Sequence, residues 1–328
     1  MRKLCVWLCV AVLLVAGCGH KTARPLTIME KLGRLDESDR ERQNLIGPVR
    51  EESSRAVVLE VRKGKVSEAG WRQTWIRRYR RNGKFAENIV RNSSPYDANG
   101  RYSRVVNKWN ADGTAGEQLC YGRDSKLNGR TATTYDRRGR IIEIDHYRPA
   151  GLLDSKELSH YDRDGRKAGQ LAYRPDGSVL WKAIRAYETG GAERVSRYGP
   201  NGKLETVGVS TPLTRSNGFE TANYDANGKL SFRWAGRFDA RWNVVEFVWR
   251  DPKGKLTSKQ AWSRDATGNV LMQTEWNPDG SIKLKETSKY TFDSRGNWTK
   301  RMVYRQVTKN GKPDLEPYEV EYRTITYY

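Results

Sequence analysis

Hydrophobic and polar residues alternate with a period of two through most of the chain after residue 47. In one clear example, Ile142 and Ile144 fall on one face of an extended chain, whereas Glu143 and Asp145 fall on the other. This alternation is typical of a β-strand that buries one face. The pattern therefore predicts an all-β fold over residues 47–328.

A second pattern marks the ends of these strands: an aromatic residue is followed four positions later by glycine. In the copy that begins at Tyr135, the side chain of Asp136 can accept a hydrogen bond from a backbone N–H two residues on, as in a type I turn. Gly139 can then adopt the left-handed conformation that closes a hairpin without a steric penalty. The turn glycines predicted in this way are Gly83, Gly100, Gly113, Gly139, Gly151, Gly165, Gly177, Gly191, Gly202, Gly228, Gly280 and Gly296.

One strand plus one turn therefore forms the repeating unit, and consecutive turns should alternate between the two ends of the sheet. A chain of such hairpins is a long antiparallel meander. Single sheets of more than roughly ten strands tend to curl, split or close. We therefore expect a strongly twisted or curled sheet, or a half-shell, preceded by a short signal and tether segment.

The repeat unit, for example Tyr224–Leu230 with the sequence YDANGKL, resembles the YD repeat of bacterial RHS-like proteins over most of residues 79–300. In large members of that family the repeats wind into a β-sheet shell around a toxin domain, and shorter members are envelope or secreted proteins. A weaker similarity to MORN-type repeats also exists, since these place glycine after an aromatic residue. Either resemblance implies a meander of hairpins.

The first eighteen residues have the features of an export signal. Two basic residues precede an apolar run over residues 4–16, which is too short to span a bilayer and suits a signal-peptide core. The run ends at Leu14–Cys18 with the sequence LVAGC, which resembles the lipobox of bacterial lipoproteins. That resemblance implies cleavage before Cys18 and attachment of a diacylglycerol and an N-acyl chain such as palmitate to it. The alternative is an ordinary secretory signal with an incidental cysteine.

The sequence accordingly divides into a signal peptide over residues 1–18, a tether over residues 19–46 and the β repeat domain over residues 47–328. The tether is interpreted as one short helix or a flexible stalk. The lipobox implies a lipid-anchored protein of the bacterial cell envelope. Gly19, in place of an aspartate, favours the outer membrane in a Gram-negative bacterium.

The chain carries a formal charge of +21, and signal cleavage lowers it to +19 because Arg2 and Lys3 leave without any acid. Such a charge could attract lipopolysaccharide, acidic envelope glycans or phospholipid headgroups. It could also belong to a solvated strand face that discourages edge pairing, as Lys283, Lys285 and Lys289 share one parity. Export makes nucleic acid an unexpected partner.

The sequence contains no Gly-x-Ser-x-Gly elbow, Walker loop, His-Glu-x-x-His or Cys-x-x-Cys motif, so no enzyme, cofactor or metal site is predicted. Cys120 is the one cysteine of the mature chain after Cys18, and we interpret it as a buried, inert thiol. His146 and His160 should lie about 25 Å apart, at opposite ends of one strand. They are therefore not expected to share a metal.

The aromatic residues allow two interpretations. They could stabilise hairpins by cross-strand packing, or some could stack on sugar rings. The candidate ligand contacts are Trp181, Trp234, Trp242 and Trp276. The leading hypothesis for function is a non-enzymatic envelope lipoprotein that acts as an interaction scaffold for a protein or an anionic glycan. The alternative is a carbohydrate-active or toxin-associated protein with a site built from carboxylates about 5 to 9 Å apart.

Overall fold

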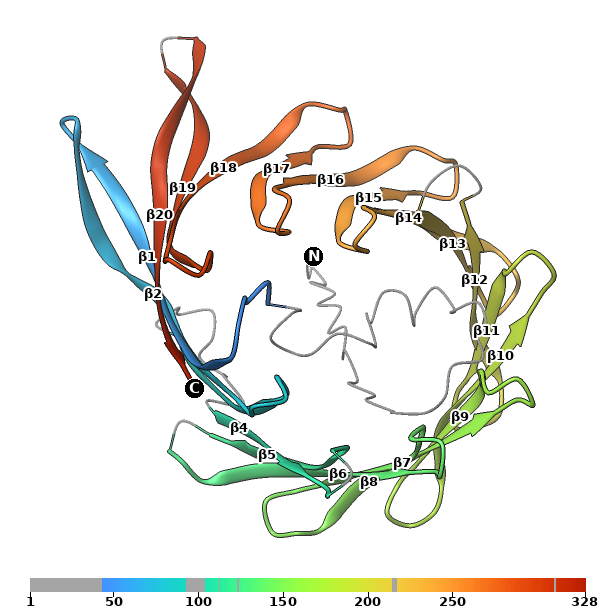
Figure 1. Cartoon of the computed structure of the whole chain (residues 1–328). Helices are drawn as coiled ribbons and strands as arrows, with labels where there is room; N and C mark the ends of the chain where they lie inside the picture. The colour runs from blue at the N-terminus through green and yellow to red at the C-terminus, as the bar shows by residue number, and fades with distance from the viewer. Residues whose placement is uncertain (1–42, 93–103, 112, 123, 214–216, 310) are drawn as a thin grey trace.

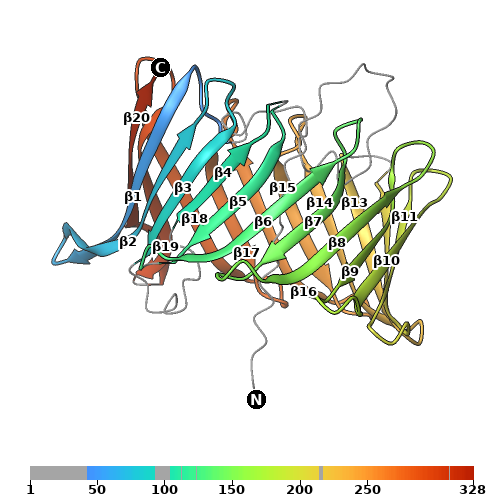
Figure 2. The same cartoon turned by 90° about the horizontal axis from the view of Figure 1, so that it is seen from below.

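A computed structural model describes residues 43–92, 104–111, 113–122, 124–213, 217–309 and 311–328. Twenty β-strands in these segments form one antiparallel sheet (Figures 1 and 2). The described segments contain no helix with the length and apolar character needed to cross a membrane. Cys18 and Gly100 lie outside the described residues, so the lipid anchor and that turn stay predictions.

The strands follow one another along the chain with short turns between most of them. The first ten are β1 (Val49–Arg62), β2 (Lys65–Tyr79), β3 (Phe85–Asn92), β4 (Arg104–Trp109), β5 (Ala115–Tyr121), β6 (Leu127–Tyr135), β7 (Ile141–Tyr147), β8 (Leu153–Tyr161), β9 (Lys167–Tyr173) and β10 (Val179–Tyr187). The last ten are β11 (Glu193–Tyr198), β12 (Leu204–Pro212), β13 (Gly218–Asp225), β14 (Leu230–Phe238), β15 (Val244–Arg250), β16 (Leu256–Arg264), β17 (Val270–Trp276), β18 (Ile282–Phe292), β19 (Trp298–Lys309) and β20 (Lys312–Tyr327).

The sheet closes on itself, which corrects the expectation of an open, curled meander. β1 pairs with β2 on one side and with β20 on the other, and Ala56 lies opposite Glu321 in the second pairing. The result is a barrel of twenty strands, seen end-on in Figure 1. Closure gives the backbone groups of the first and last strands partners that an open sheet would leave exposed at its edges.

The hairpin turns show why aspartate and glycine recur in the sequence. Asp136 accepts hydrogen bonds from the backbone N–H groups of Arg138 and Arg140 at 2.8 and 3.0 Å. The N–H of Gly139 donates to the carbonyl of Asp136 at 3.0 Å, and Gly139 has a φ of 73°. In the turn after β14 the same left-handed position is occupied by Trp242, with a φ of 62°. A tryptophan therefore stands there in a conformation that side chains resist.

The repeat tyrosines tie the end of one strand to the start of the strand before it in the chain. The hydroxyl of Tyr161, at the end of β8, donates to the carbonyl of Ile141, at the start of β7, over 2.7 Å. Equivalent bonds with the same separation of twenty residues join Tyr135 to Ala115, Tyr187 to Lys167 and Tyr290 to Val270. In each of these repeats, a tyrosine hydroxyl at the end of one strand thus holds the start of the preceding strand.

The segment that precedes β1 identifies the inner face of the barrel. Figure 1 shows this segment inside the ring of strands, and its Leu45 packs in a buried cluster with Val49 and Tyr79. Ile325 of β20 packs against the same cluster. Strand alternation and the cross-strand register then assign every other residue along each strand to this inner face.

Candidate functional site

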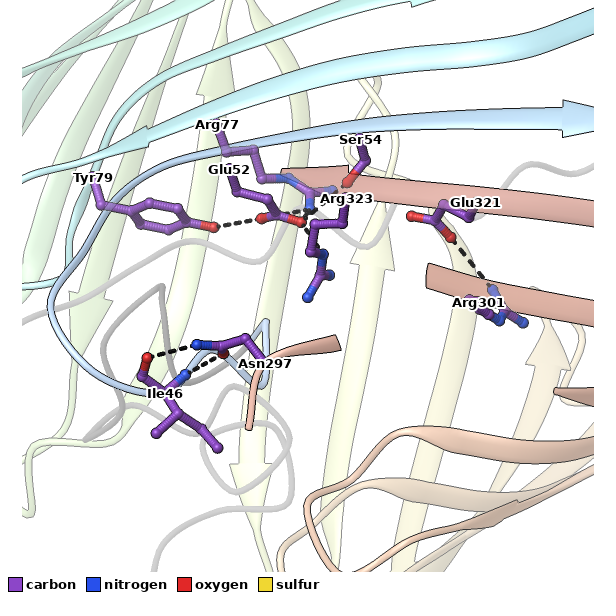
Figure 3. Close-up of polar contacts among 9 residues, drawn as sticks. All are labelled: Ile46, Glu52, Ser54, Arg77, Tyr79, Asn297, Arg301, Glu321 and Arg323. Carbon is purple, nitrogen blue, oxygen red and sulfur yellow. Dashed lines mark hydrogen bonds and ion pairs between the residues drawn. The ribbon is translucent and has the colours of Figure 1, made fainter. Parts of the chain in front are cut away.

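A cluster of buried charges holds the seam of the barrel on the inner face (Figure 3). Glu52 of β1 is completely buried, and its carboxylate lies 3.4 Å from Arg77 of β2 and 2.9 Å from Arg323 of β20. The hydroxyl of Tyr79 donates to the same carboxylate over 3.1 Å. One carboxylate therefore joins the second, first and last strands.

Burial changes the ionisation of this cluster. Burial raises the pKa of the Tyr79 hydroxyl and lowers the pKa of the Arg323 guanidinium, while nearby Glu52 favours the charged form of Arg323. Burial also raises the pKa of the Glu321 carboxyl to about 7, against the attraction of Arg301 and Arg323. The Arg301 and Glu321 side chains lie 3.7 Å apart. Because these groups neutralise one another, the cluster acts as a structural clasp.

Asn297, in the turn after β18, fastens the segment before β1 to the inner wall (Figure 3). Its side-chain amide donates to the carbonyl of Ile46 over 2.8 Å and accepts from the Ile46 N–H over 2.7 Å. The same amide donates to the hydroxyl of Tyr327 over 2.7 Å. The segment is thus held next to the seam through both the N–H and the carbonyl of Ile46.

A row of polar side chains crosses the inner wall from β6 to β11. It consists of Thr131, His146, Glu157, Gln170, Arg185 and Glu193. His146 lies 3.7 Å from Glu157, and Gln170 donates to Glu157 over 2.6 Å. The hydrogen bond from His146 is the main cause that lowers the pKa of the Glu157 carboxyl. This row places both hydrogen-bond donors and acceptors on the inner wall.

Aromatic rings cover the next part of the inner wall, from β13 to β16. This aromatic band consists of Phe219, Trp234, Phe247, Trp249 and Trp262. The Phe219 and Trp234 ring centroids lie 4.7 Å apart, and the Phe247 ring lies 5.4 to 6.2 Å from those of its three tryptophan neighbours. Gly236 makes this packing possible, because a Cβ there would lie 2.8 Å from the Phe247 ring.

Uncharged polar side chains accompany the aromatic band on the same face. These are Thr221, Asn223, Ser258, Gln260 and Gln273. The side-chain nitrogen of Asn223 is buried without a hydrogen-bond partner in the protein. A buried amide of this kind gains free energy from a partner in the lumen, since burying a polar group without one is costly. The band therefore combines apolar ring faces with hydrogen-bonding amides and hydroxyls.

The four tryptophans proposed from the sequence do not form one site. Trp234 belongs to the aromatic band, and Trp242 packs on Phe238 at the turn after β14, with 5.8 Å between ring centroids. Trp181 lies under the guanidinium of Arg197, several strands away. Trp276 pairs across strands with Lys259 and therefore lies on the outer face.

Sequence reasoning did not select Phe219 and Phe247, which contact Trp234. A signal for Phe247 was present around the turn between β14 and β15. If residues are paired across the hairpin starting from that turn, Trp234 lies opposite Trp249. Phe247 lies two residues from Trp249 and therefore on the same face. Hairpin register therefore could have grouped these rings, whereas the contact with Phe219 requires a third strand.

Cys120 and His146 approach a hollow of about 700 Å³ at the ends of β5 to β8. Cys120 is half-buried, and burial raises the pKa of its thiol, which disfavours the reactive thiolate. His160 is exposed and lies on the outer face. Its neighbour Ser159 lies opposite Gln170 of the inner wall, so His160 points the other way. The two histidines therefore lie on opposite faces of the barrel wall.

The outer wall carries pairs of opposite charges that join neighbouring strands. Lys156 lies 2.9 Å from Glu143, and Lys259 lies 3.0 Å from Glu246. Lys108 lies 2.9 Å from Glu117 in the same manner. The pairs of Lys156 and Lys259 stand near the middle of their strands, and that of Lys108 stands near the end of β4. Cross-strand ion pairs are therefore one feature of the outer wall.

No protein-family model matches the chain, and a search of curated proteins finds no match. The structure is similar to a porin-like protein from Bacteroides uniformis, with 11% identity, a TM-score of 0.31, and coverage of 86% of this chain and 98% of that one. A porin-like protein from Bacteroides vulgatus is similar with 8% identity, a TM-score of 0.21, and coverage of 84% and 97%. A structure of TcdB2-TccC3 is similar with 11% identity and a TM-score of 0.21 over 80% of this chain and 19% of that one.

The resemblance of the sequence to RHS-like and MORN-type repeat proteins is therefore corrected. The motif that carries it forms hairpin turns here, but the hairpins close into a single barrel of twenty strands. A tight turn between antiparallel strands needs the same few residues in any architecture. The motif thus reports local turn chemistry and does not determine how the sheet ends are joined.

Proposed function

We propose that the protein is a non-enzymatic barrel of the cell envelope that binds a glycan at the aromatic band of its inner wall. The observation that carries this proposal is the combination of ring faces with uncharged amides and hydroxyls on one side of the lumen. A pyranose ring has an apolar C–H face that packs on an aromatic ring and hydroxyl groups that bond to amides. The surplus of positive charge favours an acidic glycan over a neutral one.

The sequence of the N-terminus supports a location in the envelope, with Cys18 as the lipidated residue. The composition of the outer wall supports a barrel that stands in water next to the membrane. Barrels that cross a bilayer present an apolar band to lipid, and a lysine or arginine at mid-membrane costs about 2 to 4 kcal/mol. The ion pairs of Lys156 and Lys259 occupy that part of the outer wall here.

The ionic partners of the inner carboxylates favour binding over acid–base chemistry. Glu52 and Glu193, two of the most buried glutamates of the inner wall, are each in an ion pair with an arginine. Glycosidase chemistry needs one carboxyl that exchanges a proton and a second that acts as nucleophile or base. Carboxylates held by arginine are poor candidates for either role.

Titration of tryptophan fluorescence with soluble peptidoglycan fragments and with acidic and neutral oligosaccharides tests the proposal. We expect Trp249→Ala to weaken binding about tenfold, because the ring contributes on the order of 1.4 kcal/mol. Trp276→Ala is the matched control, since this tryptophan lies on the outer face. Native affinity in folded Trp249→Ala protein, or an equal loss in both variants, would overturn the proposal.

A further inference from the structure

Three lysines depart from the charge pairing of the outer wall. Lys285 and Lys289 of β18 and Lys300 of β19 share the outer face, because Lys289 lies opposite Met302 and Lys300 lies opposite Tyr322. Other lysines of this wall, such as Lys156 and Lys259, lie within 4 Å of a carboxylate, whereas Lys182 of β10 is a further lysine of the outer face without an ion pair in the described part of the chain. Among the described residues, no carboxylate lies that close to these three.

Two of these lysines lie over tyrosine rings. The ammonium group of Lys289 lies 5.2 Å from the ring centroid of Tyr304, and that of Lys300 lies 5.7 Å from the centroid of Tyr322. Tyr322 is 38% exposed on the outer face, where Arg55 also lies over its ring and its hydroxyl donates to Glu68 over 3.4 Å. We use the name basic patch for Lys285, Lys289, Lys300, Tyr304 and Tyr322.

Protection of a sheet edge does not explain the basic patch. Lysines on an exposed edge strand discourage pairing with another chain. However, β18 is hydrogen-bonded to both β17 and β19, and β19 is hydrogen-bonded to both β18 and β20. Neither strand is an edge, because the barrel is closed. Edge protection therefore does not account for the three lysines.

We infer that the basic patch is a docking surface for the phosphate headgroups of an anionic phospholipid membrane. Lysines near such a surface each contribute about 1 kcal/mol through attraction to the headgroups. Tyrosine rings favour the headgroup level because they are apolar along the ring and polar at the hydroxyl. The patch lies on the convex wall of a barrel, so it suits a broad surface better than a single chain that needs a groove. This inference concerns the outer wall and is independent of the glycan proposal.

The inference is tested by sedimentation with vesicles of the full-length chain that carries Cys18→Ser, so that no acyl chain contributes. We expect the chain to bind vesicles of phosphatidylglycerol and phosphatidylethanolamine at low salt and to bind phosphatidylcholine vesicles at least tenfold more weakly. Salt at several hundred millimolar should release it, because the Debye length falls below about 8 Å. The triple variant Lys285→Ala, Lys289→Ala and Lys300→Ala should bind the anionic vesicles at least tenfold more weakly.

A matched control removes the same charge from exposed hairpin turns, through Arg137→Ala, Arg138→Ala and Lys253→Ala. We expect this control to bind anionic vesicles within about twofold of the native affinity, and both triple variants to keep the native thermal midpoint. Equal binding by the patch variant and the native chain would overturn the inference. An equal loss in the control would also overturn the inference, because it would show that net charge alone controls binding. A third contrary outcome is that the patch variant loses binding to a soluble acidic glycan but keeps its binding to vesicles. Fluorescence titration of the patch variant with glycans separates this outcome from the proposal for the lumen.

Discussion

The carboxylate of Glu52 and the guanidinium of Arg323 lie 2.9 Å apart across the seam where the first strand of the barrel meets the last. Both side chains are buried, and the Arg323 guanidinium also lies 3.5 Å from the ring centroid of Trp298. A charge in such a place needs its partner, because water cannot replace it. The pair therefore adds a buried electrostatic contact to the backbone pairing that closes the barrel.

Removing this carboxylate should destabilise the barrel strongly. Glu52→Ala leaves the Arg323 charge buried with less compensation, and we expect a loss of about 3 to 5 kcal/mol in the free energy of unfolding. Denaturant unfolding followed by tryptophan fluorescence measures it. Glu143→Ala is the control, since its ion pair with Lys156 is partly exposed and should contribute less than about 1 kcal/mol. Equal losses in the two variants would contradict a special role for the seam.

The stability of the barrel should fall as the pH rises through a defined window. Burial raises the pKa of the Glu321 carboxyl from 4.5 to about 7. Between these values the native state holds a proton that the unfolded chain has released, so stability decreases as the pH rises. The full effect is on the order of 3 kcal/mol. Unfolding measured from pH 4 to pH 8 should show a slope that Glu321→Gln removes, and an identical slope in that variant would refute the assignment.

Substitution of one turn glycine should show the cost of the left-handed backbone. Gly228 has a φ of 78°, and a Cβ there would meet no other atom within 4 Å. Gly228→Ala should therefore destabilise by about 1 kcal/mol through backbone conformation alone. Gly70 of β2 is equally uncrowded but is not left-handed, so Gly70→Ala is the control and should be neutral or stabilising. The measurement is the thermal midpoint of both variants, and a neutral Gly228→Ala would count against the account of the turn.

The repeat tyrosines should differ in their contributions according to their hydrogen bonds. Tyr161→Phe removes the 2.7 Å bond to the Ile141 carbonyl and should cost about 1 kcal/mol of stability. Tyr173→Phe provides the comparison, because Tyr173 occupies the same motif at the other end of the barrel, on the outer face. Chemical denaturation of both variants is the test. A loss of the same size in Tyr173→Phe would mean that the bridge to the earlier strand contributes nothing specific.

The N-terminal motif predicts lipid attachment at Cys18. Cys18→Ser should abolish labelling by a radioactive or clickable palmitate and release the chain from a membrane fraction washed with high salt, because no acyl chain then enters the bilayer. Cys120→Ser is the control and should be labelled like the native chain. Labelling retained in Cys18→Ser would exclude the lipoprotein assignment.

The local architecture of the protein follows from short stretches of its sequence. A left-handed glycine three residues after the start of most turns, with an aspartate at the start of several, as in Asp136 and Gly139, places the chain reversal, and this also sets the register of the adjoining strands. Alternation then divides residues such as Ile144 and Glu143 between two faces. These features depend on contacts within about thirty residues, so propensity and hydrogen bonding are sufficient to predict them.

Tertiary structure decided which face is inside and how the sheet ends. Closure depends on small twists and register shifts added over twenty strands, and on the meeting of β1 with β20. No local signal specifies that sum, so an open, curled sheet was predicted. The aromatic band depends on the same information, because Phe219, Trp234 and Trp262 belong to three strands whose alignment sets which rings touch. The turns are therefore a property of the sequence, whereas the lumen and its lining arise when the two ends of the sheet pair.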